Sequence, residues 1–319
     1  MKQKLLITRR LPDRVLEAAR ARFDVTLRDR TDPLSAEELR AALRDYDLVL
    51  PTLGDRFQAD VFADVSAPRA KILANFGVGY NHIDADAAKA AGVAVSNTPG
   101  AVTDATADIA LSLILMTARR LGEGERVLRA GAWEGWGPVQ MLGTHVTGKR
   151  IGIIGFGRIG KAIARRCHYG FGMEVVFYNR SRVEDAGMPA RQVEMAEAMA
   201  ADFVVVAVPG GKATHHLIDA KALKLMQKTG IFVNISRGDV VDETALIETL
   251  QQGRIAGAGL DVYEFEPKVP VALMAMENVT LLPHLGTACL EVREDMGLMA
   301  VANLIAFAEG KVPPNLVNP

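Results

Sequence analysis

Short apolar runs alternate with segments of helical periodicity along almost the whole chain. Apolar runs that alternate with helices in this way are typical of βα units, so the pattern predicts parallel sheets covered by helices. The runs fall into two series, and a long, largely apolar helix is expected between them over residues 103–120. The sequence therefore predicts an α/β protein with two parallel-sheet domains.

The first series predicts a five-stranded sheet. Helices are expected over residues 12–21 and 35–44, and Ser35 followed by Glu38 three residues later forms a capping box at the start of the second helix. The expected strands cover residues 5–8, 23–27, 48–51, 72–75 and 93–97.

The second series predicts six strands, the full number for a doubly wound dinucleotide-binding sheet. A last helix, over residues 292–308, follows the final strand and has no strand of its own in the second sheet. We expect this helix to return to the first domain, which would make that domain discontinuous. The expected strands cover residues 151–154, 174–178, 203–208, 231–235, 255–260 and 279–282.

The composition of the chain argues against nucleic acid and membranes as binding partners. Of 319 residues, 24% are charged, and the formal net charge of -1 gives no basic field for nucleic acid or an anionic membrane. The longest apolar stretch, 109–117, is too short to span a bilayer, and the first eight residues are too short for a signal peptide. Cys167 and Cys289 match no metal-ligand spacing, so we expect no metal and a reducing, cytoplasmic location.

A glycine-rich segment follows the first strand of the second series. Gly155, Gly157 and Gly160 form a G-x-G-x-x-G between the strand at 151–154 and an alanine-rich helix at 161–166. In this setting the first glycine makes a tight turn, the second lets a pyrophosphate approach the backbone, and the third lets helix and strand pack closely. The helix N-terminus then favours the anion, so the segment predicts a dinucleotide site.

The end of the next strand indicates which dinucleotide is bound. An NAD site usually has an acidic residue there for the ribose 2′-hydroxyl, but this strand ends in Asn179, Arg180, Ser181 and Arg182. Guanidinium groups bind a 2′-phosphate with charge-assisted hydrogen bonds, whereas a carboxylate would repel it. We therefore predict NADP in preference to NAD.

Three later segments, 234–239, 259–267 and 282–287, follow predicted strands at the edge where open α/β sheets bind ligands. Arg237 offers a planar fork that matches a carboxylate. His284 can donate a proton near neutral pH. Glu266 would favour the protonated imidazole and orient its ring. These residue types suit the reduction of a 2-oxo acid.

The chain resembles the D-isomer-specific 2-hydroxyacid dehydrogenase family, and most closely its glyoxylate/hydroxypyruvate reductases. The resemblance covers nearly the whole chain and rests on the segments 75–84 and 103–108, the glycine-rich loop and the three later segments. It implies two Rossmann-like domains with an active-site cleft between them, and a homodimer.

The family's domain plan implies a flavodoxin-like substrate-binding domain made of residues 1–99 and 287–319. Residues 100–286 would form the dinucleotide-binding Rossmann domain, with a dimerisation helix and loop at 103–146. Related reductases place a tryptophan-bearing loop in the neighbouring subunit's active site. Trp133 and Trp136 match that loop, so Trp136 is expected to contact substrate.

The resemblance also implies roles for individual residues. Arg237, Glu266 and His284 would be catalytic, and Arg237 and His284 would also contact the substrate. The backbone of Val78 and Gly79 would hold the substrate carboxylate, and Leu53 is a further expected substrate contact. The remaining expected cofactor contacts are Thr106, Arg158, Ile159, Pro209, Thr214, Ile235, Asp261 and Gly286.

The implied function is NADPH-dependent reduction of small 2-oxo acids, such as glyoxylate and hydroxypyruvate, by hydride transfer with His284 as general acid. Two alternatives stay open. The substrate could be a larger 2-oxo acid, or the chain could be a cofactor-sensing binding protein like the transcriptional corepressors that share this fold.

Overall fold

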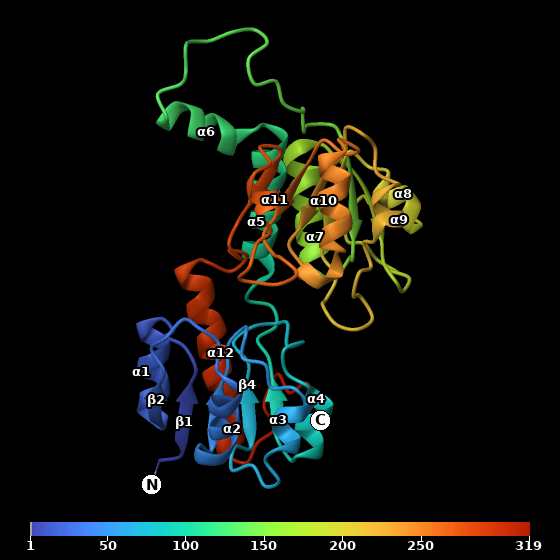
Figure 1. Ribbon diagram of the computed structural model, residues 1–319. Helices are drawn as coiled ribbons and strands as arrows, with labels where there is room; N and C mark the ends of the chain where they lie inside the picture. The colour runs from blue at the N-terminus through green and yellow to red at the C-terminus, as the bar shows by residue number, and fades with distance from the viewer. Residues whose placement is uncertain (1) are drawn as a thin grey trace. The chain divides into compact units, whose positions relative to one another are not determined.

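The computed structural model describes residues 2–319 and divides into two compact units (Figure 1). Unit 1 comprises Met1–Val102 and Ala288–Pro319, and unit 2 comprises Thr103–Thr287. Each unit contains one parallel sheet, with five strands in unit 1 and seven in unit 2 among the described residues. The predicted α/β class with two Rossmann-like parallel-sheet domains is confirmed.

The sheet of unit 1 has the strand order β2-β1-β3-β4-β5, which is the flavodoxin-like order. Its strands are β1 (Lys4–Ile7), β2 (Asp24–Leu27), β3 (Leu48–Leu50), β4 (Ile72–Ala74) and β5 (Ala94–Ser96). Its helices are α1 (Asp13–Arg22), α2 (Ala36–Asp45), α3 (Ala59–Ala63), α4 (Ala85–Ala90) and α12 (Leu290–Ala308).

Alternation along β1 explains how unit 1 is covered on both faces. Leu5 and Ile7 are fully buried in a cluster with residues of α1 and α12, whereas Leu6 between them belongs to a cluster with residues of α2, α3 and α4. Successive side chains of a strand point to opposite faces, so one short strand contributes to two cores. The last helix, α12, lies beside α1 and β4 (Figure 1).

The sheet of unit 2 has the order β12-β11-β10-β9-β6-β7-β8. Its strands are β6 (Arg150–Ile154), β7 (Glu174–Tyr178), β8 (Arg191–Gln192), β9 (Phe203–Val206), β10 (Ile231–Asn234), β11 (Gly257–Leu260) and β12 (Val279–Leu281). Its helices are α5 (Thr103–Ala118), α6 (Leu121–Arg129), α7 (Arg158–Arg165), α8 (Met195–Met199), α9 (Ala220–Leu223), α10 (Glu243–Gln251) and α11 (Val271–Met274), with a π-helical turn at Arg166–Gly170 and a 3-10 turn at Gly238–Val240.

Helix α5 packs unusually close to the sheet of unit 2. A Cβ added at Gly259 of β11 would lie 2.9 Å from Leu113 Cβ, and one at Gly257 would lie 3.1 Å from Thr117 Cγ2. Thr117 Oγ1 donates to Thr280 Oγ1 at 2.9 Å. The two glycines therefore let the helix lie against β11 and β12.

Unit 2 contains two elements that the sequence did not predict. The sheet has a seventh strand, β8, whose two residues pair with Val176 and Phe177 at the edge; two residues are too few to show an alternating pattern. The helical region expected at 103–120 continues after a break. Arg120 has a φ of 53°, and α6 starts at the next residue. By contrast, the capping box of Ser35 and Glu38 is confirmed.

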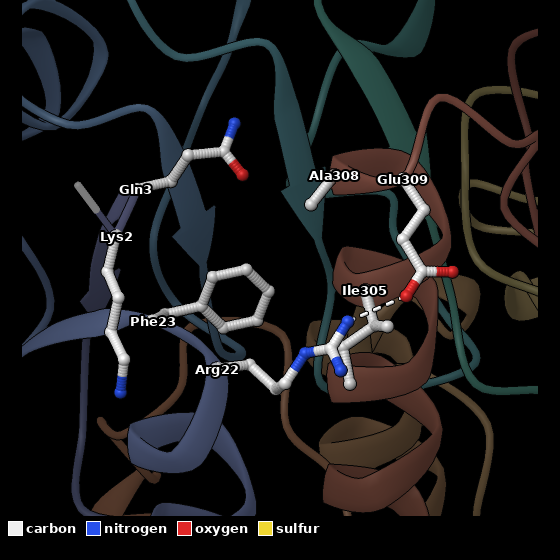
Figure 2. A pocket seen from close by; sticks show the side chains of 7 residues that line it. All are labelled: Lys2, Gln3, Arg22, Phe23, Ile305, Ala308 and Glu309. Atoms are coloured by element: carbon white, nitrogen blue, oxygen red, sulfur yellow. Dashed lines mark hydrogen bonds and ion pairs between the residues drawn. The ribbon is translucent and has the colours of Figure 1, made fainter.

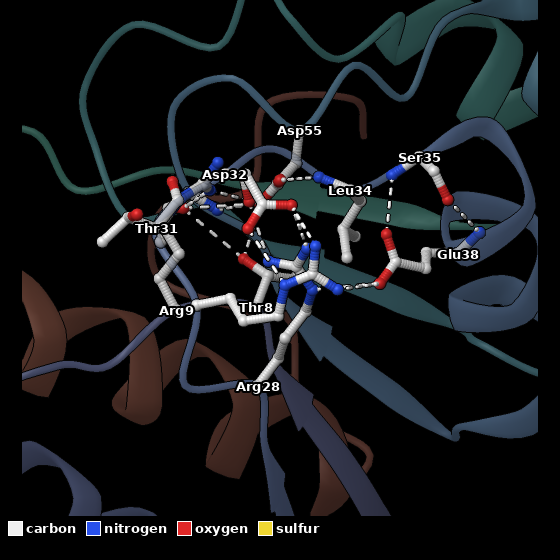
Figure 3. Close-up of polar contacts among 11 residues, drawn as sticks. Thr8, Arg9, Arg28, Thr31, Asp32, Leu34, Ser35, Glu38 and Asp55 are labelled. Atoms are coloured by element: carbon white, nitrogen blue, oxygen red, sulfur yellow. Dashed lines mark hydrogen bonds and ion pairs between the residues drawn. The ribbon is translucent and has the colours of Figure 1, made fainter.

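A buried carboxylate fixes the turn after β3 (Figure 3). Asp55 is fully buried and accepts hydrogen bonds from Thr8 Oγ1 at 2.5 Å, the N–H of Thr52 at 3.0 Å and the N–H of Leu34 at 3.1 Å. Its Oδ2 also forms an ion pair with Arg9 Nη1 at 2.9 Å. One carboxylate thus joins β1, the turn after β3 and the start of the α2 region.

None of the helices described over residues 2–319 is both long enough and apolar enough to cross a membrane.

We expect Asp55→Ala to lower the free energy of unfolding of unit 1 by about 3–5 kcal/mol, because it leaves a guanidinium and two backbone N–H groups without their buried partner. Chemical denaturation followed by circular dichroism, fitted with a separate transition for each unit, measures this. Asp13→Ala removes an exposed ion pair with Arg10 and is the matched control, with little change expected. Equal transitions for both variants would contradict the role given to Asp55.

Candidate active site

The carboxyl ends of four neighbouring parallel strands of unit 2 lie at one edge of the sheet. Asn234 of β10 is in register with Leu260 of β11 and Val206 of β9, and Leu260 is in register with Leu281 of β12. The segments that follow these strands therefore lie at the same edge, which is where open α/β sheets bind ligands. Arg237, Asp261 and His284 all lie in these segments.

The turn that carries Arg237 is held by a side chain and by close packing. Asn234 accepts a hydrogen bond from the N–H of Ser236 at 3.0 Å and donates one to the carbonyl of Arg237 at 3.0 Å. A Cβ at Gly238 would lie 1.8 Å from the carbonyl carbon of Tyr263. Because only glycine fits there, the turn after β10 lies directly against the loop that leads to Glu266.

Glu266 and His284 form a direct pair. His284 Nδ1 lies 2.9 Å from Glu266 Oε2, and both side chains are about one-third exposed. The other carboxylate oxygen of Glu266 accepts the N–H of Tyr263 at 3.0 Å. Both oxygens are engaged, so the carboxylate cannot rotate freely, and it fixes the orientation of the imidazole. The structure brings this predicted pair together.

The charges around the pair favour an ionised carboxylate. Burial works against ionisation of Glu266, but the hydrogen bond and charge of His284, the Tyr263 N–H and the charge of Arg237 together lower its pKa. Burial lowers the pKa of Arg237, against the charges of Glu266 and Asp239; a guanidinium nevertheless stays protonated in proteins. The site therefore holds a fixed cation beside an anion that accepts from an imidazole.

The carboxylate of Asp261 anchors the turn that carries His284. Asp261 is 1% exposed, and its two oxygens accept the N–H groups of Leu285 at 2.6 Å and Gly286 at 2.8 Å. Its backbone carbonyl accepts the N–H of His284 at 2.9 Å. Three successive N–H groups are therefore fixed by one residue. Burial raises the pKa of Asp261, and the two carboxylate hydrogen bonds oppose that effect.

His284 has a left-handed backbone, with a φ of 54°. This conformation is uncommon for residues other than glycine and persists only where the surroundings impose it. The hydrogen bonds to Asp261 impose it here, and they aim the ring at Glu266. Thr106 of α5 adds a hydrogen bond from its hydroxyl to the carbonyl of Gly286 at 3.2 Å.

The glycine-rich loop fits a dinucleotide pyrophosphate. A Cβ at Gly155 would lie 2.8 Å from Ala207 and one at Gly160 would lie 2.2 Å from the carbonyl oxygen of Gly155, so both positions require glycine. A Cβ at Gly157 would meet nothing within 4 Å, which leaves the loop open on that side. Gly157 caps α7 without a side-chain hydrogen bond, so the first N–H groups, beginning at Arg158, can face an anion.

The segment after β7 presents two arginines to solvent. Asn179 accepts the N–H of Phe156 at 3.2 Å and donates to the carbonyl of Ser181 at 2.9 Å, so it ties this segment to the glycine-rich loop. Arg180, Ser181 and Arg182 are exposed. Arg182 lies 3.6 Å from Glu184, and both of these side chains are 84% exposed. The predicted 2′-phosphate group would meet cations rather than a carboxylate at Asn179.

In unit 1, the predicted carboxylate-binding backbone lies in a loop after β4. Asn75 donates to the carbonyls of Gly77 at 2.9 Å and Gly79 at 3.1 Å, and Asn97 donates to the carbonyl of Val78 at 2.9 Å. Within residues 2–319, no hydrogen bond uses the N–H of Val78 or Gly79. Asn75 and Asn97 were not predicted from the sequence as part of the site, although an asparagine directly after a buried strand is a signal for such a turn.

The other predicted residues are distributed as follows. Leu53 is 40% exposed in the turn that Asp55 holds. Trp136 is 83% exposed in the connection between α6 and β6. Ile235 is buried next to Ser236, Pro209 is exposed after β9, and the hydroxyl of Thr214 donates to the Pro209 carbonyl at 2.7 Å. The remaining predicted contact, Ile159, is half-buried in the first turn of α7.

Two hollows in unit 1 contain none of the predicted residues. One, of about 600 Å³, lies between α1 and α12 and is crossed by an ion pair of Arg22 and Glu309 at 2.6 Å (Figure 2). The other, of about 370 Å³, lies at the start of α12 beside Phe76 and Cys289. Neither supplies the acid–base chemistry found in unit 2.

Comparisons with known proteins all indicate the same family, and the similar proteins cover nearly the whole chain. The family model described as "D-isomer specific 2-hydroxyacid dehydrogenase, NAD binding domain" matches residues 111–286. Glyoxylate reductases from Thermococcus onnurineus and Pyrococcus furiosus are 45% and 43% identical, covering 100% of this chain and 96% of each relative. The crystal structure of an NADPH-dependent glyoxylate/hydroxypyruvate reductase from Sinorhizobium meliloti, in complex with NADP and malonate, is 35% identical with a TM-score of 0.88 and covers 99% of this chain and 97% of that one.

We expect Asp261→Asn to lower the free energy of unfolding of unit 2 by about 1–3 kcal/mol, because an amide can accept only one of the two buried N–H groups. Hydrogen exchange at Leu285 and Gly286 should become faster in the same variant. Asp185→Asn, in which an exposed carboxylate accepts a single N–H from Gly187, is the control. Unchanged exchange at both amides would show that the anchor lies elsewhere.

Proposed function

Because the chain belongs to the D-isomer specific 2-hydroxyacid dehydrogenase family, we propose that it reduces small 2-oxo acids, with glyoxylate and hydroxypyruvate as substrates and NADPH as the preferred reductant. The family makes it an oxidoreductase of EC 1.1.1 type that uses a nicotinamide cofactor. The observation that carries the proposal is the pairing of His284 with Glu266, together with the nearby charge of Arg237.

In this proposal His284 is the general acid. Its Nδ1 faces the carboxylate of Glu266, which leaves Nε2 as the atom that donates a proton to the substrate oxygen. The hydrogen bond to Glu266 fixes the plane of the imidazole ring. The anchored turn at 284–286 holds Nε2 in position, so little reorganisation is needed when the proton moves.

Arg237 and the loop after β4 bind the substrate in this proposal. The guanidinium of Arg237 polarises the ketone and attracts the carboxylate. The N–H groups of Val78 and Gly79 bind the carboxylate. Asn75 and Asn97 hold the carbonyls of this loop, and this fixes the backbone that presents the two N–H groups. Leu53 sets the size of the acid that fits.

Unit 2 is the cofactor-binding domain in this proposal, and unit 1 is the substrate-binding domain. When bound, the nicotinamide supplies the hydride that reduces the ketone carbon. The N–H groups at the start of α7, from Arg158 onward, hold the pyrophosphate, and Gly157 leaves room for it. The further cofactor contacts we propose are Thr106, Ile159, Pro209, Thr214, Ile235, Asp261 and Gly286.

Arg180, Ser181 and Arg182 hold the 2′-phosphate of NADP. The support is the exposure of all three side chains and the amide, rather than a carboxylate, at Asn179. The hydroxyl and the two guanidinium groups can each donate to phosphate oxygens.

The chain forms a homodimer in this proposal. The support is a set of large apolar side chains that are more than half exposed on α6 and the connection after it, namely Leu121, Leu128, Trp133, Trp136, Val139 and Leu142. A surface of this kind marks an interaction site, and a second copy would cover it. Trp136 then contacts the substrate of the other subunit.

The first test is an absorbance assay with glyoxylate and hydroxypyruvate. We expect turnover, and we expect His284→Ala to lower kcat by about 100-fold or more. Glu266→Gln, which keeps an acceptor but removes the charge, should also lower kcat, because the charge-assisted hydrogen bond that orients the imidazole is lost. The exposed His145→Ala is the control. Near-normal turnover of His284→Ala would reject it as the acid.

A second test concerns the cofactor. In Arg180→Ala/Arg182→Ala we expect the KM for NADPH to rise by about 100-fold or more, because each charge-assisted hydrogen bond to phosphate contributes about 1.5–3 kcal/mol and the variant removes one from each arginine. The KM for NADH should change little. Arg191→Ala, another exposed arginine that pairs with Glu197, is the control. Equal changes for the two cofactors would place the phosphate site elsewhere.

A third test concerns assembly. Sedimentation should give about twice the chain mass of 34.3 kDa, and Leu128→Asp should shift the protein to a monomer because it puts a charge into the apolar contact. Lys224→Asp, a charge change on the exposed end of α9, is the control. A wild-type monomer at micromolar concentration would exclude the dimer and the role of Trp136.

A further inference from the structure

Two histidines and a glutamate outside the His284–Glu266 pair come together in unit 2. His215 and His216 lie in the connection between β9 and α9, and Glu264 lies in the loop after β11. Each offers one ligand atom, and these three atoms lie within 4.8 Å of one another. Among the described residues, this is the one group of three or more such side chains with that closeness.

The backbone conformation places the imidazole rings of His215 and His216 on the same side of the chain. Neighbouring side chains point to opposite sides of an extended chain, but His216 has a left-handed φ of 49°. The rings of His215 and His216 consequently stack, with centroids 4.0 Å apart and planes at 23°. Both rings can therefore offer a nitrogen to one ion.

The scaffold around the cluster is well fixed. The N–H of His216 donates to the carbonyl of Asp239 at 2.8 Å. His216 Nε2 lies 2.9 Å from Glu264 Oε1, while Glu264 Oε2 accepts the N–H of Glu243 at 3.4 Å. Glu243 Oε1 in turn accepts the N–H of Glu264 at 3.3 Å. Outer contacts of this kind orient ligands and strengthen metal binding.

We propose that His215, His216 and Glu264 bind a Zn²⁺ ion or a cation of similar ligand preference, with water completing the coordination. Two imidazoles and a carboxylate are a known three-ligand set for zinc, which binds nitrogen at about 2.0–2.1 Å and so places tetrahedral ligands about 3.4 Å apart. The exposed ring of His215 can rotate to close the remaining gap. The ion would replace the hydrogen bond between His216 and Glu264.

This site is separate from the proposed catalytic pair, although Glu264 lies two residues before Glu266 on the same loop. The catalytic pair offers one imidazole and one carboxylate, and within residues 2–319 it belongs to no such group of three. The two sites can therefore be told apart by their variants, and metal binding can be measured without turnover.

The test titrates the full chain, without an affinity tag and after chelator treatment, with Zn²⁺ by calorimetry and with Co²⁺ by visible absorption. We expect one equivalent bound and the intense bands of four-coordinate Co²⁺ with no sulfur-to-metal charge transfer. His215→Ala and Glu264→Gln should each weaken binding by at least about 100-fold, since even outer-shell losses cost 10- to 100-fold. His215→Ala changes an exposed side chain, so it keeps the fold, and it should retain reductase activity.

Two controls separate the proposal from other sources of binding. His284→Ala and His145→Ala should both keep the one-equivalent titration. Binding that disappears in His284→Ala but persists in His215→Ala would assign the metal to the catalytic pair and overturn the proposal. Binding that is absent in the wild type, or unchanged in both His215→Ala and Glu264→Gln, would also overturn it.

Discussion

The grip of Asp261 on the turn after β12 is the interaction on which the rest of the candidate site depends. One buried residue engages three consecutive N–H groups, those of His284, Leu285 and Gly286. Without it, a left-handed backbone at a histidine would relax to a common conformation, and the ring would lose its place beside Glu266. Burying a carboxylate is costly, and the two hydrogen bonds to its oxygens offset that cost.

Close backbone packing complements this grip. Gly238 allows the turn that carries Arg237 to lie against Tyr263. Gly155 lets the glycine-rich loop lie against Ala207 after β9, and Gly160 lets the first turn of α7 lie against Gly155. Each of these contacts needs the absence of a side chain rather than the presence of one. The chemistry of unit 2 is thus carried by a few side chains, and their positions are set by glycines and backbone hydrogen bonds.

The sequence predicted most of what depends on local pattern. The strands of both sheets, the capping box at Ser35 and the strand–glycine–helix unit follow from periodicity and short motifs. Strand β8 and helix α6 were missed, because a two-residue strand has no period and the left-handed residue that separates α5 from α6 has no clear sequence signal.

Properties that depend on tertiary contact were harder to predict. Asp261 was expected near the cofactor, and its hold on two N–H groups could not be read from spacing. The roles of Asn75 and Asn97 depend on where a loop returns. Nothing in the sequence groups His215 and His216 with Glu264, because Glu264 is far along the chain.

The position of the aromatic loop has a consequence for spectroscopy. Both tryptophans of the chain, Trp133 and Trp136, lie in the connection between α6 and β6 and are 54% and 83% exposed. Neither belongs to a buried core. Intrinsic tryptophan emission therefore reports the surroundings of this one segment and is insensitive to the packing of either sheet. It is a built-in optical probe of whatever covers that surface.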